Sequence, residues 1–300
     1  MILLFYEKAN TGQIVVRKFY LRRMMRIWPL YYLIVFICFI CLPPLLGPNY
    51  FLYTPPLRSI QLVLFLFPNL VGPLGPLGHL WSIGLEEQFY LIWPRVLKED
   101  SGIFLRIAFG IVILKLLLAP VIAAFQIDSM LMLFNSLRFE CMAIGAIGAF
   151  LYYEKHPLLK WAYHPIGQGF SFGSIVYFAV IDIPLNSYST FFTSLIFIVI
   201  ILNLATNPAS WLQLDTPLSN LLGQMSYGIY MYHFPLLYVV IFTLRKMGVP
   251  EGGLFDFYLY TITIGGTLFF AYISYRWFET PFLRKKSQFT VIQSHKTLLR

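Results

Sequence analysis

The sequence predicts an all-α fold, a polytopic transmembrane helical bundle of about eight spans with a short re-entrant segment. Three observations predict it. The chain has 300 residues, of which 58% are hydrophobic and 12% are charged, and this charged share is about half that of a soluble domain. The mean hydropathy is +0.71. The polar stretches are short and separate apolar runs, so we expect one membrane domain over residues 1–300, with a basic cytoplasmic tail at 284–300.

The formal net charge of +9 would suggest a nucleic-acid partner in a soluble protein. In a membrane protein the excess of Lys and Arg in cytoplasmic loops explains it better, and we expect no nucleic-acid partner. Cys38 and Cys41 form a C-x-x-C pair inside an apolar run, with no second pair to complete a zinc site. We therefore interpret them as helix-packing residues and expect no metal site.

The elements are expected in the following order. Residues 1–6 are the end of an apolar helix, and the basic segment 7–26 leads into the first span at 27–46. Residues 60–70 are apolar but too short to cross about 30 Å of hydrocarbon, so they form a re-entrant or interfacial piece. A helix starting at His79 then crosses back, with Pro94 as its expected interruption. Further spans are expected at 103–124, 130–153, 166–183, 189–206, 223–244 and 257–278.

The charge distribution predicts the orientation. One side of the predicted topology holds six Lys and Arg residues in 7–26, three in 95–106, two in 154–164 and six in 276–300, which is 17 of the 22 in the chain. The opposite side holds only three, namely Arg58, Arg245 and Lys246. Because Lys and Arg are enriched in cytoplasmic loops, both termini are expected in the cytoplasm.

The stretch HLWSIGLEEQFYLIWP, residues 79–94, carries ionisable groups between apolar segments. Helical positions seven apart return to within roughly 20°, so His79, Ser82 and Glu86 share one face while Glu87 points elsewhere. An ionisable group at membrane depth costs about 2.5–3.5 kcal/mol and normally faces a protein interior or a wet cavity. A histidine and a carboxylate on such a face can move a proton. The alternative is a hydrogen-bonded pair that only ties two helices together.

Arg23 and Arg26 are three residues apart, so on a helix their guanidinium groups lie on one face. Planar guanidinium forks at this spacing suit a phosphate-bearing ligand. The alternative is ordinary anchoring of a span at the cytoplasmic surface.

Two further groups of polar residues fall within predicted spans. Ser226, Tyr230 and His233 lie at positions i, i+4 and i+7, so they either bind a polar acceptor or form hydrogen bonds between helices. Arg138 and Glu140 are two residues apart and point to opposite sides of a helix. Each therefore needs its own partner, and a structural ion pair between helices is the alternative to a substrate contact.

Four stretches, in this order, resemble the membrane acyltransferase-3 family, the bacterial multi-span O-acetylases of surface sugars. They are KFYLRRMMRIWPLYY (18–32), HLWSIGLEEQFYLIWP (79–94), LLGQMSYGIYMYHFP (221–235) and RWFETPF (276–282). The resemblance implies transfer of an acyl group, usually acetyl, from acetyl-CoA to a hydroxyl of a carbohydrate or cell-surface glycan. Acyl-CoA is then a co-substrate, with no permanently bound cofactor. The implied location is the bacterial cytoplasmic membrane.

The resemblance also implies roles for particular residues. Arg23 and Arg26 match the family's R-x-x-R motif, which engages the acyl donor, and Glu86 matches the glutamate of its H-L-W-S-x-x-x-E stretch. Acyl transfer to an alcohol needs a base, and Glu86 with His79 are the catalytic candidates. The candidate substrate contacts are Ser82, Ser226, Tyr230, His233 and Arg138. The predicted topology puts the arginines on the inner side and Glu86 with His79 on the outer side, so the donor's pantetheine arm or a relay must bridge them.

The family opens with a helix carrying Arg or Lys and, eleven residues further on, a histidine regarded as essential, and a second helix follows. By this resemblance the chain begins inside the tail of that second helix, so it is N-terminally incomplete, and no residue takes that histidine's role. We therefore expect the chain made alone to be unstable and not to transfer acyl groups. Two other functions stay open: a transporter or flippase that uses the intramembrane charges as a pathway, and an inactive fragment.

Overall fold

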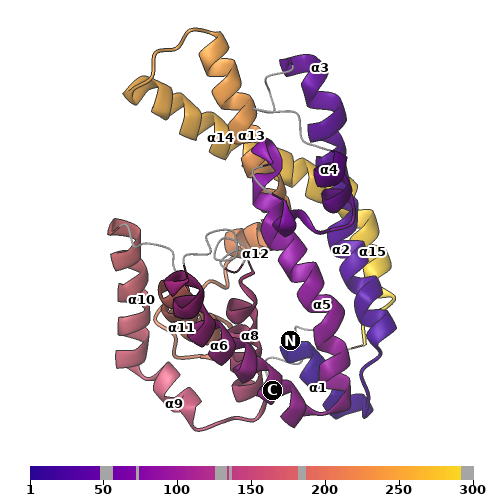
Figure 1. Cartoon of the computed structure of the whole chain (residues 1–300), viewed down its shortest axis with the longest axis vertical. Coiled ribbons are helices and arrows are strands. Elements are labelled where there is room, and N and C mark those ends of the chain that lie inside the picture. Colours follow the sequence, from indigo (N-terminus) through magenta and orange to yellow (C-terminus); the bar gives the residue numbers. More distant parts are fainter. Residues whose placement is uncertain (48–56, 72–73, 126–133, 135–136, 182–186, 292–300) are drawn as a thin grey trace. The chain divides into compact units, whose positions relative to one another are not determined.

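The computed structural model describes residues 1–47, 57–71, 74–125, 134, 137–181 and 187–291 (Figure 1). Every regular element in these residues is helical, which confirms the predicted all-α class. The chain divides into two compact units. Unit 1 comprises Met1–Val16, Gln88–Leu214 and Val291–Arg300, and unit 2 comprises Arg17–Glu87 and Asp215–Thr290. Helix α5 (Trp81–Glu99) gives its first turns to unit 2 and the rest to unit 1.

Five helices among the described residues are long and apolar enough to cross a membrane. They are Val16–Pro44, Gly102–Ile122, Tyr188–Thr206, Ser226–Lys246 and Gly253–Ser287. Together with the shorter apolar helix Phe139–Tyr153 they make this a polytopic helical membrane protein, as the composition predicts. Three of the eight expected spans are not among these five. The one at 79–94 corresponds to α5, which carries Glu86 and Glu87. The one at 130–153 falls partly outside the described residues. The one at 166–183 corresponds to the shorter helix α10 (Pro165–Val180), which has 16 residues.

Unit 1 contains six helices of its own among the described residues: α1 (Ile2–Thr11), α6 (Ser101–Ala124), α8 (Phe139–Tyr153), α9 (Leu158–Tyr163), α10 (Pro165–Val180) and α11 (Ser187–Thr206). The apolar N-terminal turns pack into this unit, because the ring of Phe5 lies 5.3 Å from that of Phe104 and 5.2 Å from that of Tyr153. Gly148 on α8 lets α11 come close, since a Cβ there would overlap the Ile198 side chain.

The loop before α6 is stabilised by a side-chain cap. Asp100 precedes the helix, and its Oδ2 accepts a hydrogen bond from the Ile103 N–H at 3.0 Å. Backbone N–H groups of Gly102 and Ile103 face this carboxylate and hold the pKa of Asp100 below its usual range. The cap marks where α5 ends and α6 begins.

Unit 2 begins with α2 (Val16–Phe36), which continues through a π-helical turn (Ile37–Cys41) and α3 (Leu42–Leu46). This helix ends at Gly47, where φ is 89° and glycine is therefore favoured. The short apolar segment expected at 60–70 consists of α4 (Leu57–Leu64) and a 3₁₀ turn. The unit ends with α12 (Pro217–Gln224), α13 (Ser226–Lys246), α14 (Gly253–Ile273), a π-helical turn (Ser274–Glu279) and α15 (Thr280–Ser287).

Helices α13 and α14 lie side by side (Figure 1). Small residues allow the close approach: a Cβ on Gly266 would lie 2.7 Å from Cδ2 of Leu236, and one on Gly228 would lie 3.3 Å from Cα of Ala271. Glycine at such contacts is typical of helix pairs in membranes, where van der Waals packing replaces the hydrophobic effect.

Two expectations for residues 79–94 are wrong. The helix does not begin at His79, because Gly75–Leu80 forms a 3₁₀ turn and α5 starts at Trp81. Pro94 does not interrupt it, since α5 continues to Glu99. Proline is tolerated inside membrane helices because neighbouring helices and local adjustments satisfy the backbone groups that it frees.

The tail expected at 284–300 is helical in its first residues, because α15 extends to Ser287. Three basic residues form its last turn: Arg284, Lys285 and Lys286. Residues 292–300 lie outside the described part of the chain.

Candidate functional site

A pocket of about 270 Å³ lies within unit 2, between α2, the start of α5 and α13. We call it the Arg–Glu pocket. It is lined by Arg23, Arg26, Ile27, Ser82, Ile83, Glu86, Ser226, Tyr227 and Tyr230. Six of these residues were singled out by the sequence, although they come from three separate stretches of the chain. The structure therefore brings the two arginines together with a carboxylate and several hydroxyl groups.

The expected separation of the arginines from Glu86 is wrong, since Arg23, Arg26 and Glu86 line the same pocket. That expectation assumed that the helix carrying Glu86 enters from the outer surface. After a re-entrant segment, the next helix can instead begin at any depth within the membrane. Here α4 and two 3₁₀ turns precede α5, so the side from which the chain arrives does not set the depth of Glu86.

A chain of hydrogen bonds crosses the pocket wall. The Tyr230 hydroxyl donates to the backbone carbonyl of His79, and Ser82 Oγ lies 2.5 Å from the same hydroxyl. A carbonyl only accepts, and a hydroxyl has one proton, so Ser82 donates to Tyr230 and Tyr230 donates to His79. Ser226 Oγ likewise donates to the Gly223 carbonyl at 2.9 Å. These three hydroxyls thus present lone pairs to the pocket, and the N–H groups of the arginines are its proton donors.

His79 lies behind this wall and does not line the pocket. Its side chain is 6% exposed, and its ring lies 5.2 Å from that of Tyr230, 5.1 Å from that of His233 and 5.4 Å from that of Phe234. His233 Nδ1 lies 2.5 Å from the Tyr230 carbonyl and therefore carries a proton. His79 contributes its carbonyl to the Ser82–Tyr230 chain, whereas its imidazole packs among rings.

The two adjacent glutamates have different surroundings, as the helical phase predicts. Glu86 lines the Arg–Glu pocket. Glu87 accepts a hydrogen bond from Trp28 Nε1 at 3.1 Å and is absent from the pocket lining. Glu87 therefore joins α5 to α2, and Glu86 is the carboxylate that a ligand in the pocket can reach.

Two residues were missed at the sequence level, namely Tyr227, which lines the pocket, and Glu279, which acts on one of its arginines. Glu279 is 6% exposed, accepts from Ser274 Oγ at 3.1 Å and acts electrostatically on Arg26. Tyr227 donates to the Ile27 carbonyl at 2.8 Å. A carboxylate within the stretch RWFETPF, at the end of a predicted span, indicated a possible functional residue. No spacing in the sequence relates Glu279 to Arg26.

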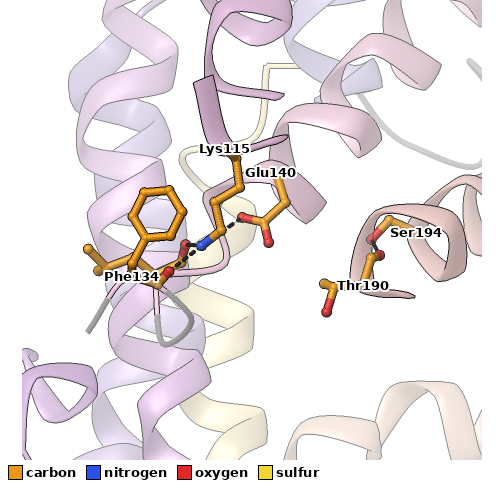
Figure 2. Close-up of polar contacts among 6 residues, drawn as sticks. Lys115, Phe134, Glu140, Thr190 and Ser194 are labelled. Atoms are coloured by element: carbon orange, nitrogen blue, oxygen red, sulfur yellow. Dashed lines mark hydrogen bonds and ion pairs between the residues drawn. The ribbon is translucent and has the colours of Figure 1, made fainter. Parts of the chain in front are cut away.

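Glu140 takes part in an ion pair inside unit 1 (Figure 2). Lys115 Nζ on α6 lies 3.7 Å from Glu140 Oε2 on α8 and donates to the carbonyls of Leu137, at 2.9 Å, and of Phe134. This is the ion pair between helices that was the alternative to a substrate contact at Glu140.

Arg138 lines a different pocket, of about 340 Å³, within unit 1. The polar residues that share this lining are Cys141, Thr190, Thr193 and Ser194, and Ser194 Oγ donates to the Thr190 carbonyl at 2.7 Å (Figure 2). A substrate contact by Arg138 stays a prediction. Among the described residues no group of three or more His, Cys, Asp or Glu side chains could hold a metal ion.

These features define an integral membrane protein with a pocket that is lined by both guanidinium groups and a carboxylate. The model of the acyltransferase domain matches residues 2–276, a stretch that runs through both units. The chain therefore belongs to the acyltransferase 3 family.

The relatives found among known proteins carry the corresponding names. One is the O-acetyltransferase OatA of Staphylococcus aureus strain NCTC 8325, 30% identical over 227 residues, which cover 70% of this chain and 36% of the relative. Another, from Staphylococcus aureus strain COL, is provisionally named an O-acetyltransferase and is 28% identical over 228 residues, covering 70% of this chain and 37% of the relative. The match thus spans little more than a third of each relative. No solved structure matches the chain.

Proposed function

We propose that this protein moves an acyl group, acetyl in particular, from acyl-CoA to a hydroxyl of a carbohydrate or cell-surface glycan. The observation that carries the proposal is the Arg–Glu pocket, where two guanidinium groups and a carboxylate share one cavity. Relatives named O-acetyltransferases favour an oxygen acceptor. Family membership favours acyl transfer over transport or flipping.

Arg23 and Arg26 bind the acyl donor in this proposal. They lie on one face of α2 and both line the pocket. A CoA thioester is a polyanion, and guanidinium forks bind phosphate and oxyanion groups through paired N–H bonds. Because each guanidinium has five N–H groups, the pair can contact the donor and still keep partners within the protein.

The proposed reaction forms an ester bond and breaks a thioester bond. The acceptor oxygen attacks the thioester carbonyl while Glu86 takes the hydroxyl proton. The CoA thiolate then leaves and takes this proton from Glu86, which restores the carboxylate. Negative charge develops on the carbonyl oxygen during the attack. The hydroxyl protons of Ser82, Tyr230 and Ser226 are already used, so these hydroxyls are not the groups that stabilise it.

The hydroxyl groups have a different role, namely orientation of the acceptor. Ser82, Tyr230 and Ser226 present lone pairs to the pocket, so they accept hydrogen bonds from the hydroxyls of a sugar. His79 and His233 hold Tyr230 in place through its hydroxyl and its carbonyl. They are positioning residues in this proposal, and Glu86 is the base.

Transfer can be measured in membrane vesicles that contain the chain, supplied with acetyl-CoA labelled in its acetyl group and with cell-surface glycans. Alkali-labile label in the glycan fraction that depends on the chain and on both reactants would support the proposal, and it would overturn the expectation from the sequence that the chain made alone transfers no acyl groups. Vesicles prepared without the chain are the control. Label that enters lipid or protein instead of glycan would contradict the acceptor class, and label that does not depend on the chain would contradict the enzyme.

We also propose that both termini lie in the cytoplasm, because 17 of the 22 Lys and Arg residues fall on that side of the predicted topology. Single cysteines at residues 250 and 290, in a chain whose own three cysteines are replaced, should react with a membrane-impermeant reagent from outside at 250 and only after permeabilisation at 290. The reverse pattern would contradict the assignment.

A further inference from the structure

Unit 1 also contains a cavity of about 580 Å³, which lies between α6, α8, α9, α10 and α11. We call it the unit 1 slot. Its lining runs along α11 from Phe191 to Leu202, a rise of about 16 Å along the helix axis. Both α6 and α11 belong to the helices that are long and apolar enough to cross a membrane. The slot is therefore elongated along membrane-spanning helices, as a lipid chain in a bilayer is.

The lining of the slot offers almost no polar group to a ligand. Ser171 is buried, and its Oγ donates to the Gly167 carbonyl at 2.8 Å, so its proton is already used. Apart from the indole nitrogen of Trp161, the other side chains that line the slot among the described residues are hydrocarbon. A polar molecule placed there would lose its hydrogen bonds to water without replacement. The lining therefore favours a hydrocarbon chain.

The slot has a buried floor and an exposed rim. Val112 and Ile144 on the floor are 7% and 4% exposed, whereas Trp161 and Phe170 on the rim are 78% and 69% exposed. Because the rim belongs to apolar helices of a membrane protein, its exposed side chains meet lipid rather than water. A chain can therefore enter the slot sideways from the bilayer.

The slot begins at the end of unit 1 where α9 joins α8 to α10 (Figure 1). The start of α6 and the end of α8 lie at this end, because the ring of Phe5 is 5.3 Å from that of Phe104 and 5.7 Å from that of Phe150. The end of α11 lies here too, since Asn203 Nδ2 donates to the Ala162 carbonyl on α9 at 2.8 Å. A lipid chain in the slot would thus have its headgroup at this end or beyond it.

Arg106 is a basic residue at this end that shares a helix face with the rim. It precedes Phe109 by three positions and Ile113 by seven on α6, so the three residues lie on one face, and both apolar residues line the slot and are exposed. Arg106 is itself exposed. Asp100 interacts with it electrostatically, but the Asp100 carboxylate already accepts the Ile103 N–H.

We propose that the unit 1 slot binds one hydrocarbon chain of an anionic phospholipid, whose phosphate lies beside Arg106. A guanidinium fork pairs with phosphate oxygens, and a basic residue at the membrane surface attracts anionic headgroups. A phospholipid without net charge would gain the same contacts for its chain and less from Arg106. The inference does not rest on the proposed function, because the Arg–Glu pocket belongs to unit 2 and the slot to unit 1.

The test uses the purified full chain in detergent and two radiolabelled lipids, phosphatidylglycerol, which is anionic, and phosphatidylcholine, which is zwitterionic. We expect saturable binding of one phosphatidylglycerol per chain, about fivefold tighter than that of phosphatidylcholine. Arg106→Ala should remove this preference. Lys160→Ala should keep it, because Lys160 lies on the side of α9 opposite Leu158 and Ala162, which line the slot.

Filling the slot tests the place of the chain. Ala162→Phe should weaken the binding of both lipids about tenfold, whereas Ala179→Phe, on an exposed part of α10 that does not line the slot, should bind them as wild type does. Thermal unfolding checks that each variant is folded. In the wild-type chain, phosphatidylglycerol with a photoreactive group at the end of one chain should label α11 near Phe191.

Four results would overturn the inference. The first is equal affinity of the wild-type chain for the two lipids, and the second is an equal loss of preference in Arg106→Ala and Lys160→Ala. The third is photolabelling confined to the helices of unit 2, which remains decisive if Ala162→Phe does not fold. The fourth is a dimer without bound lipid in native mass spectrometry, which would mean that a second copy of the chain covers the slot.

Discussion

The two units treat charge inside the membrane in opposite ways. In unit 1 the ammonium of Lys115 is matched by Glu140 and by the carbonyls of Phe134 and Leu137. In unit 2 Arg23, Arg26 and Glu86 line a cavity. Both arrangements place costly groups among apolar helices. The difference shows that an intramembrane charge becomes a candidate for function when its surroundings include space for a ligand, and a structural element when the protein itself supplies its partners.

The largest effect is expected at Glu86. Glu86→Gln keeps the shape and removes the base, so transfer should fall by about 10²–10⁴-fold with little change in thermal unfolding. Glu87→Gln is the matched control, because Glu87 bonds to Trp28 and does not line the pocket. Initial rates of acetyl transfer in vesicles give the comparison. A greater loss for Glu87→Gln would mean that the pocket is not the active site.

The ion pair of unit 1 should govern stability instead. Lys115→Met leaves Glu140 buried without its cation, and such a loss typically costs about 3–5 kcal/mol. The double change Lys115→Met with Glu140→Leu removes both charges and should recover part of that loss. Thermal unfolding in detergent measures both variants. A stable Lys115→Met protein with impaired acyl-CoA binding would assign this pair to the site rather than to the scaffold.

A smaller effect, on the binding of acyl-CoA, is expected at the two arginines of the pocket. Arg23→Ala or Arg26→Ala removes charge-assisted hydrogen bonds worth about 1.5–3 kcal/mol, so acyl-CoA should bind about ten- to hundredfold more weakly. Lys18→Ala is the control, since Lys18 is an exposed cation on the same helix. Equilibrium binding of acetyl-CoA separates the cases. Equal small losses for all three variants would make the segment a membrane anchor.

Patterns along one helix were predictable from the sequence, and contacts between helices were not. The 3.6-residue period put His79, Ser82 and Glu86 on one face. Ser82 and Glu86 line the pocket, whereas His79 lies in the 3₁₀ turn before the helix and does not line it. The same reasoning could not place Arg23 and Arg26 in that pocket, because their position depends on how α2 packs against α5. The depth of Glu86 within the membrane could not be predicted either, because it depends on where α5 begins, and a 3₁₀ turn at Gly75–Leu80 sets that point.

Long-range partners show the same limit. Hydropathy and charge bias fix the helical class and the main spans, because they sum over many residues. The partner of Glu140 proved to be Lys115. No local signal distinguishes this lysine from other basic residues of the chain. Only packing reveals which charges meet.

The smallest expected effect is that of removing one tyrosine hydroxyl in each unit. Tyr230 donates to the His79 carbonyl and accepts from Ser82. Tyr163 in unit 1 donates to Thr206 Oγ1 at 2.7 Å, because the Thr206 hydroxyl proton goes to the Leu202 carbonyl. Tyr230→Phe removes two hydrogen bonds and Tyr163→Phe removes one, and the free energy of unfolding should fall by about 0.5–1.5 kcal/mol for each bond lost. Only Tyr230→Phe should also raise the KM for the acceptor, because only Tyr230 lines the Arg–Glu pocket and presents a lone pair there. The two variants can be compared by thermal unfolding and by initial rates at varied acceptor concentration. If both raise the KM equally, the effect reflects general loosening of the bundle, and Tyr230 then has no direct part in binding the acceptor.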